Sequence, residues 1–357
     1  MFSEGKEYIK MILDDIEVDS LFEKTPVVLF IFKRSETLPA IIEKIREYSP
    51  HKIYLLADGP RDEEERYLVE KTRSLALELI DWKCDIIKNF SEENIGVYKN
   101  IGEKAKWVFQ FEDQAIFLED DNLPETTFFE YCDHLLKKYK DIDDVLWICG
   151  TNYLGNTQSF SNFDYYYTRN LLPCGWASWS SKFESSYDGE LKSLNDTAIS
   201  KMSETYIDKK LFHQELQTVK QTRFNYLRDP RLVSWDRQMV FSVRSSHKYG
   251  IAPALNQIKN IGADELSTHG GTSTNKIMTS RFCEITTQPL KFPLASPTVL
   301  KIDVPFESAI EQLILYPVSG RILRHFGRMA KSILGIDPDD SLALILKNRR
   351  IKKNKKE

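Results

Sequence analysis

Three acidic side chains, Glu119, Asp120 and Asp121, directly follow an apolar run in the stretch AIFLEDDNLPETTFFEY. Neighbouring carboxylates repel one another unless a cation or hydrogen bonds compensate. In a strand, successive side chains point to opposite faces, so Glu119 and Asp121 are expected on one side and Asp120 on the other. Hard oxygen ligands favour Mg²⁺ or Mn²⁺. The triplet therefore indicates either a site that holds a cation and a polar ligand, or a solvated acidic turn.

Four further side chains could do chemistry, and each has an ordinary structural alternative. Arg34 offers a planar cation for a phosphate, or is a surface residue at a strand end. Asp58 either contacts a ligand or caps the turn that Gly59 and Pro60 begin. Asp236 either takes a proton from a hydroxyl group as a general base or pairs with Arg237. His269, followed by two glycines, is typical of a loop that closes over a site.

Two aromatic clusters are open to two interpretations. Trp176 and Trp179 in GWASW either pack in a core or contact a sugar. Residues 165–167 are three consecutive tyrosines, which form either a sugar-stacking surface or, as we prefer, a plain strand.

The elements that must position these residues alternate along the first half of the chain. Apolar runs typical of buried strands lie at residues 25–35, 51–60, 83–89, 114–121 and 144–152. Helical periodicity lies between them, at residues 38–48, 62–80, 97–110 and 125–140. This alternation predicts an α/β fold with a mostly parallel sheet flanked by helices. Ligands bind at the carboxyl ends of such strands, where the acidic triplet falls.

The rest of the chain lacks this regular alternation of predicted strands and helices. Residues 1–24 have the spacing of a short helix, and residues 151–170 suggest a long loop or short antiparallel strands. The stretch LPCGWASWSSKF suggests a turn that leads into a helix, and residues 189–230 a helical excursion.

Composition excludes several classes. The chain has 357 residues, 41% of them hydrophobic, enough for a large core, and its net charge of -4 gives no case for nucleic-acid binding. Five scattered cysteines without a CxxC pair argue against zinc and suit a reducing cytosol. The first 20 residues lack the apolar region of a signal peptide, and no apolar run is long enough to span a membrane.

Charge is uneven. Residues 321–357 contain 11 Lys and Arg against 4 Asp and Glu. Their pattern predicts either a basic amphipathic helix on an anionic membrane surface or a core-packed helix with a solubilising tail. We therefore expect a cytoplasmic protein, peripheral on the inner face of the cell membrane if the first alternative holds.

Six stretches, taken in order, resemble one family. VVLFIFKRSETLPAIIEKI, LLADGP, AIFLEDDNLPETTFFEY, GWASW, SWDRQM and NIGADELSTHGG are similar to motifs of GT-A-fold nucleotide-sugar glycosyltransferases. The likeness is to the N-acetylglucosaminyltransferase I type and bacterial family 2-like relatives, over residues 25–272. It implies a Rossmann-like GT-A fold with a smaller acceptor-side region. It also implies transfer, with inversion, of a sugar from a nucleotide diphosphate, usually UDP and of UDP-GlcNAc type, to a hydroxyl of a glycan or lipid-linked acceptor in polysaccharide biosynthesis.

The resemblance also implies residue roles. Asp121 matches the ligand of a Mn²⁺ or Mg²⁺ ion, and Asp236 the catalytic base. The implied donor contacts are Arg34, Asp58, Glu119, Asp120, Trp176 and His269. One departure is Arg237, which stands where the family often has a second acid.

The implied division of the chain is a helix at 1–24, a nucleotide-sugar-binding half at 25–150, an acceptor-binding half at 151–300 and a basic tail at 301–357. Two other functions stay open. A sugar-nucleotide nucleotidyltransferase also uses an α/β sheet with a carboxylate-bound metal, although the stretch FKRSETLP lacks the glycines of its usual loop. A non-catalytic nucleotide-sugar-binding module would have lost the acids.

Overall fold

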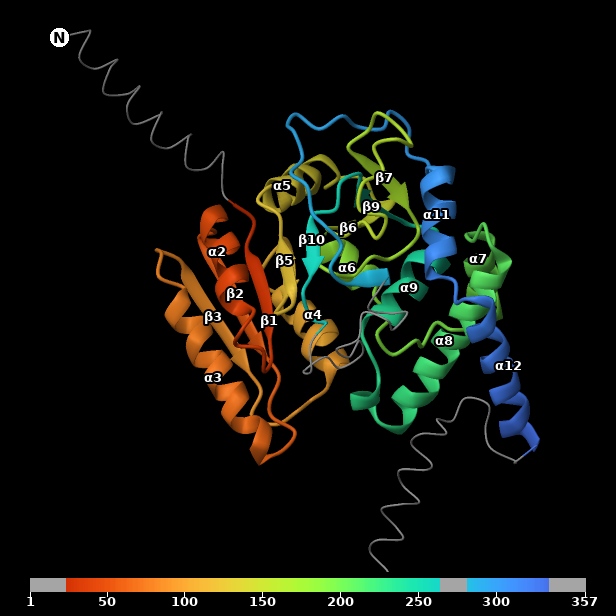
Figure 1. Ribbon diagram of the computed structural model, residues 1–357, viewed down its shortest axis with the longest axis horizontal. Helices are drawn as coiled ribbons and strands as arrows, with labels where there is room; N and C mark the ends of the chain where they lie inside the picture. Colours follow the sequence, from red (N-terminus) through yellow and green to blue (C-terminus); the bar gives the residue numbers. More distant parts are fainter. Residues whose placement is uncertain (1–23, 264–280, 334–357) are drawn as a thin grey trace, which may run out of the picture.

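The computed structural model describes residues 24–263 and 281–333, and an eight-stranded sheet forms its centre (Figure 1). The strand order is β3-β2-β1-β4-β8-β6-β9-β7. Four of the seven ladders are parallel, and β8 and β7 make the antiparallel ones. The strands are β1 (Val27–Ile31), β2 (Lys52–Ala57), β3 (Asp85–Phe90), β4 (Gln114–Glu119), β6 (Val145–Cys149), β7 (Tyr165–Thr168), β8 (Trp176–Trp179) and β9 (Tyr249–Pro253). The predicted α/β fold with a mostly parallel, helix-flanked sheet is confirmed.

Helices cover both faces of this sheet, as alternate residues of β1 illustrate. Val27, Leu29 and Ile31 pack in one cluster, whereas Val28 and Phe30 pack in the other. The first cluster takes residues from α2 (Leu38–Tyr48), α3 (Glu63–Leu79) and α5 (Phe128–Lys138). The second takes residues from the π-helical turn η1 (Tyr98–Glu103), α4 (Lys104–Val108), α6 (Ser180–Ser186), α9 (Asp236–Ser245) and α11 (Val304–Ile314). Burial on both faces explains why β1 is a continuous apolar run.

The remaining elements complete the second half of the chain. Helices α7 (Asp196–Glu204) and α8 (Lys209–Arg228) form a third apolar cluster with Phe241 of α9, and the short helix η2 (Pro230–Leu232) follows α8. A second, two-stranded sheet joins β5 (Asn122–Pro124) to β10 (Ile258–Asn260). The chain ends its described part in α12 (Val318–Ile333).

The five predicted strands and the helices between them are confirmed, with η1 and α4 together filling the 97–110 helix. The tyrosines at 165–167 lie in strand β7, and α7 and α8 confirm the helical excursion. The prediction of a turn before α6 was wrong, because Trp176–Trp179 is strand β8, inserted between β4 and β6. A four-residue strand is too short to show a period of its own.

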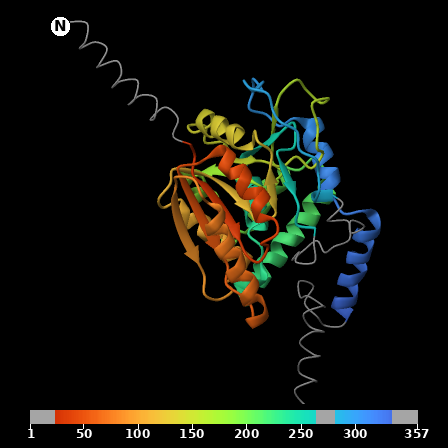
Figure 2. The same cartoon turned by 60° about the vertical axis from the view of Figure 1, so that its left-hand side comes forward.

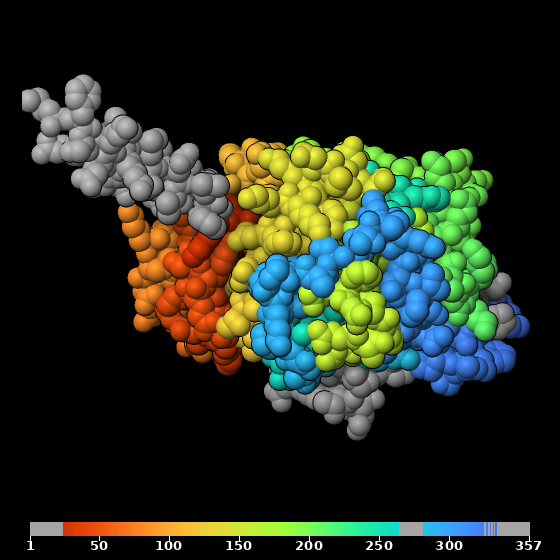
Figure 3. All heavy atoms as spheres, turned by 90° about the horizontal axis from the view of Figure 1, so that it is seen from above, coloured from red at the N-terminus to blue at the C-terminus, as the bar shows by residue number. Residues whose placement is uncertain are grey.

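The segment from residue 281 to 303 returns over the long loop that precedes β7. Figure 3 shows this blue segment against the yellow-green loop, and the Ala295 N–H donates to Asp164 Oδ2 at 2.7 Å. Helix α11 is then held by Arg244, which lies 3.6 Å from Glu307 and 3.4 Å from Glu311, all three side chains being buried. This network fixes α11 to α9.

Several predictions concern residues outside the described ranges, namely the helix at 1–24 and the basic end of the tail beyond residue 333. The sheet is continuous from 25–150 into 151–300, so the division of roles between these halves stays a prediction. Among the described helices, none is both long and apolar enough to cross a bilayer.

Candidate active site

The acidic triplet lies at the carboxyl end of β4, beside the carboxyl end of β1. Glu119 is the last residue of β4 and stands in register with Phe30 of β1. Asp120 and Asp121 form the turn into β5. The edge of the sheet where ligands bind in α/β proteins thus carries all three acids, as the sequence predicted.

Asp120 points back toward β1, where two groups fix it. The Phe32 N–H donates to Asp120 Oδ2 at 2.8 Å, and Arg34 Nη1 lies 3.5 Å from Asp120 Oδ1. Burial raises the pKa of Asp120 to about 7, with the charge of Asp121 adding to the rise and Arg34 opposing it. The carboxylate is therefore held rigidly but at an electrostatic cost.

Asp121 contacts the same arginine and a second, newly apparent set of residues. Arg34 Nη1 lies 3.1 Å from Asp121 Oδ2, and Asn122 Nδ2 donates to Asp121 Oδ1 at 2.6 Å. Asn122 is buried, and its Oδ1 accepts from the Gly175 N–H at 2.9 Å. Gly262 approaches so closely that a Cβ atom there would lie 2.4 Å from Asp121 Oδ2. Only glycine fits at this position without a shift of the Asp121 side chain.

Glu119 lies within reach of the charge of Asp236. Burial, followed by the charges of Asp121, Asp120 and Asp236, holds the pKa of Glu119 well above its usual range. Within residues 24–263 and 281–333 its carboxylate accepts no hydrogen bond, in contrast to Asp120 and Asp121. The structure therefore brings the predicted base to the same place as the triplet.

Asp236 is the first residue of α9, and three neighbours set its position. Trp235 is buried against Trp147 and Trp176, with ring centroids 5.8 and 5.5 Å away, which anchors the start of the helix. The Ser234 hydroxyl donates to Asp236 Oδ1, and Arg237 Nε lies 3.6 Å from Asp236 Oδ2. The pairing with Arg237 that the sequence offered as an alternative is thus present, and the base role stays a prediction.

Asp58 is saturated by protein donors at the end of β2. Its Oδ1 accepts from the N–H groups of Gly59 and Ile95, both at 2.8 Å. Its Oδ2 accepts from the Gly96 N–H and from Asn94 Nδ2, both at 3.0 Å. Asp58 therefore holds the loop of residues 94–96 on the sheet. A contact of Asp58 with the nucleotide sugar, as predicted, would add to these four hydrogen bonds within the protein.

Trp176 does not lie at the surface of the site. It is 1% exposed and stacks between Phe117, at a centroid distance of 3.7 Å, and Trp147, at 4.1 Å. A bound donor cannot reach this indole, so its predicted donor contact is corrected to core packing. The cause is β8, which carries the residue into the middle of the sheet. The predicted contact by His269 falls outside the described residues.

The oxygen ligands available at the acidic turn fit a hard divalent cation that takes most of its other ligands from its substrate and water. The ligand atoms of the turn are carboxylate oxygens, and among residues 24–263 and 281–333 Arg34 is the cation that the three acids share. Among the described residues, no three His, Cys, Asp or Glu side chains converge to hold a metal ion. Mg²⁺ typically uses only one or two carboxylates, with water and substrate phosphates completing its shell. Asp121 can be that ligand if Arg34 gives up its contact with Oδ2.

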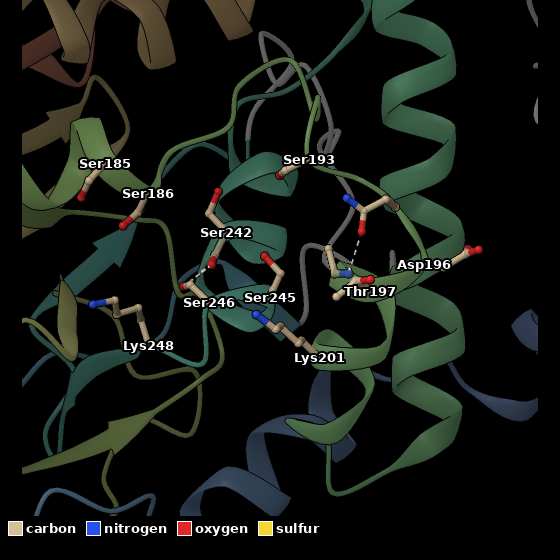
Figure 4. Close-up of a pocket in the computed structure, with 12 residues that line it drawn as sticks. Ser185, Ser186, Ser193, Asp196, Thr197, Lys201, Ser242, Ser245, Ser246 and Lys248 are labelled. Atoms are coloured by element: carbon tan, nitrogen blue, oxygen red, sulfur yellow. Dashed lines mark hydrogen bonds between the residues drawn. The ribbon is translucent and has the colours of Figure 1, made fainter.

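Two sizeable pockets lie elsewhere. One of about 960 Å³ lies between α6, α7 and α9 and is lined mostly by hydroxyl groups and by Lys201 and Lys248 (Figure 4). The other, of about 1300 Å³, is lined by Thr25, Tyr48 and Asp133, at the amino ends of β1 and β4. Neither is lined by the site acids, so the chemistry of the acidic turn does not extend into them.

Asn122 and Gly262 are the site residues that sequence reasoning missed. Asn122 directly follows the triplet, and Gly262 lies inside the stretch NIGADELSTHGG, so both residues belong to motifs already identified in the sequence. What the sequence lacked was the pairing of β5 with β10, which sets Asn122 opposite Asn260 and brings Gly262 onto Asp121.

No protein-family model matches the chain, and no curated protein matches it. Solved structures show a distant likeness. HddC from Yersinia pseudotuberculosis, complexed with GMP-PN, is 13% identical, with a TM-score of 0.25, over 35% of this chain and 57% of that one. A UDP-glucose pyrophosphorylase complexed with UDP-glucose is 9% identical, with a TM-score of 0.33, over 66% and 93%. The glycosyltransferase GlyE of Streptococcus pneumoniae TIGR4 is 12% identical, with a TM-score of 0.26, over 66% and 55%.

The chain thus covers less than two thirds of HddC and of GlyE. At these TM-scores the likeness does not identify a reaction, and the function below rests on the acidic turn.

Proposed function

We propose that this protein is a metal-dependent inverting glycosyltransferase. It moves a sugar from a nucleotide diphosphate donor, UDP-linked and of UDP-GlcNAc type, to a hydroxyl of a glycan or lipid-linked acceptor. One observation carries the proposal. Glu119, Asp120 and Asp121 stand at the carboxyl end of β4 with Arg34 among them, close enough to Asp236 for its charge to raise the pKa of Glu119. The motif order that resembles GT-A-fold enzymes supports it.

The residues of the acidic turn divide between binding and orientation. The turn is preorganised, because Phe32 and Arg34 fix Asp120 while Asn122 fixes Asp121. Arg34 offers a cation to the diphosphate. Glu119, beside these residues at the end of β4, can form a hydrogen bond with a sugar hydroxyl. A bound Mg²⁺ or Mn²⁺ on Asp121 would offset the negative charge of the leaving nucleotide diphosphate.

Asp236 would act on the other side of the donor sugar. Its carboxylate takes the proton of the acceptor hydroxyl as the acceptor oxygen forms a bond to the anomeric carbon. The bond from that carbon to the phosphate oxygen breaks, and its electron pair leaves with the nucleotide diphosphate. One displacement inverts the anomeric configuration. Such proton transfer is typically worth about 10²–10⁴-fold in rate.

The proposal is tested by binding of nucleotide sugars. We expect one nucleotide sugar of a panel to raise the melting temperature in the presence of Mn²⁺, because a ligand of the native state stabilises it. Asp121→Ala should remove the metal-dependent part of the shift. Asp141→Ala, which changes an exposed acid, is the matched control and should behave as the wild type. If no nucleotide sugar of the panel raises the melting temperature of the wild type with any divalent ion, the proposal is contradicted.

A further inference from the structure

Helix α12 carries a continuous apolar face that the body of the protein leaves exposed. Figures 1 and 2 show the helix projecting away from the sheet beyond α11. Its large apolar side chains are between 48% and 82% exposed: Val318, Ile322, Leu323, Phe326, Met329 and Ile333. At 3.6 residues per turn, all of them except Leu323 fall on one stripe, and Leu323 borders it.

The charged residues in the sequence of α12 are all basic. Arg321, Arg324 and Lys331 lie away from the apolar stripe by helical spacing, and the sequence from 318 to 333 contains no Asp or Glu. Arg324 stacks on the Tyr316 ring at 4.0 Å, which holds its charge near the start of the helix. A helix with a large apolar face and a cationic polar face is typical of segments that lie in the interface of a membrane.

We propose that α12 docks on an anionic lipid bilayer, with its apolar stripe in the boundary of the acyl chains and its basic residues among the head groups. A second copy of the chain is a poorer occupant, because residues 318–333 carry cations and no Asp or Glu, so two such helices bear charge of the same sign. An anionic surface supplies the opposite charge. The sequence beyond the described residues adds seven Lys and Arg against four acids, which favours the same partner. The inference does not depend on the proposed catalytic function.

The experiment is co-sedimentation of the full chain with phosphatidylcholine vesicles that contain or lack phosphatidylglycerol. We expect binding to the anionic vesicles alone, weakened by salt. The double variant L323S/M329S, which changes two exposed apolar residues, should bind at least tenfold more weakly. R321Q/R324Q should bind about 25-fold more weakly, since each basic residue near a charged surface contributes about fivefold.

The matched control is Leu227→Ser, which changes a residue that is 71% exposed on α8, away from α12. It should bind as the wild type does, and both Leu227→Ser and L323S/M329S should keep the wild-type melting temperature because the altered side chains are exposed. The proposal is overturned if the wild type does not sediment with anionic vesicles, or if it binds neutral vesicles equally well. It is also overturned if L323S/M329S binds normally, or if the wild type is a dimer in solution that this double variant dissociates.

Discussion

Arg34 is the cation of the acidic turn, and replacing it with alanine tests whether the acids repel as the structure indicates. The Arg34, Asp120 and Asp121 side chains are 13%, 9% and 18% exposed, and Arg34 Nη1 lies 3.5 and 3.1 Å from the two carboxylates. With an effective dielectric constant of about 20, each contact contributes roughly 5 kcal/mol of Coulomb attraction, much of which desolvation offsets. Removing one partner of such a buried pair costs about 3–5 kcal/mol.

We therefore expect Arg34→Ala to lower the free energy of unfolding at pH 8 by about 3–5 kcal/mol, as measured by urea denaturation. Lys33→Ala is the matched control. Lys33 pairs with Glu65 at 2.8 Å, but Glu65 keeps Arg61, so the loss should be smaller. Millimolar Mn²⁺ should restore more stability to Arg34→Ala than to the wild type, because Arg34 then no longer competes with the ion for Asp121 Oδ2. Equal losses in the two variants, or equal effects of Mn²⁺ on Arg34→Ala and the wild type, would refute the reasoning.

Three further predictions concern groups around the site. Gly262→Ala should lower the free energy of unfolding by about 1–3 kcal/mol and weaken binding of the nucleotide sugar, because its Cβ would lie 2.4 Å from a carboxylate oxygen of Asp121. The control is Gly320→Ala, whose Cβ would meet nothing closer than 3.9 Å. Its binding of the nucleotide sugar, measured by calorimetry, should match that of the wild type. Asp58→Asn should lower the free energy of unfolding, measured by urea denaturation, by about 1–3 kcal/mol, because the new NH₂ group would face N–H groups that now donate to the carboxylate. Arg61 holds the pKa of Glu65 at about 2, so Glu65 stabilises the fold above its unfolded pKa and loses that contribution as pH falls toward 2. Glu65→Gln should therefore flatten the acid limb of stability against pH, and Glu64→Gln, at an exposed position, should not.

The sequence predicted the part of the site that depends on strand direction, because parallel strands bring their carboxyl ends to one edge. It did not predict that β1 pairs with β4, which brings Arg34 onto the triplet although more than 80 residues separate them. Asp236 was predicted from its motif, and its charge reaches Glu119 of the triplet, while its role as the base stays a prediction.

The remainder could not be predicted, because it depends on short elements and long-range pairing. Trp176 lies in a four-residue strand, which is too short to show the alternation of apolar and polar residues that marks a strand. Its burial between Phe117 and Trp147 could therefore not be predicted. The saturation of Asp58 depends on a loop 36 to 38 residues away, whose backbone N–H groups carry no sequence signal. The close approach of Gly262 follows from the pairing of two three-residue strands.

The measurement that tests the central claim most directly is the product formed from the nucleotide sugar that binds, with Mn²⁺ and with either a hydroxyl acceptor or pyrophosphate. We predict release of the nucleotide diphosphate with the acceptor and no nucleoside triphosphate with pyrophosphate. Asp236→Asn should still bind the donor but lose this release by about 10²–10⁴-fold. Formation of the triphosphate would instead identify a nucleotidyltransferase. Donor binding without either product would identify a binding module, and full activity of Asp236→Asn would contradict its role as the base.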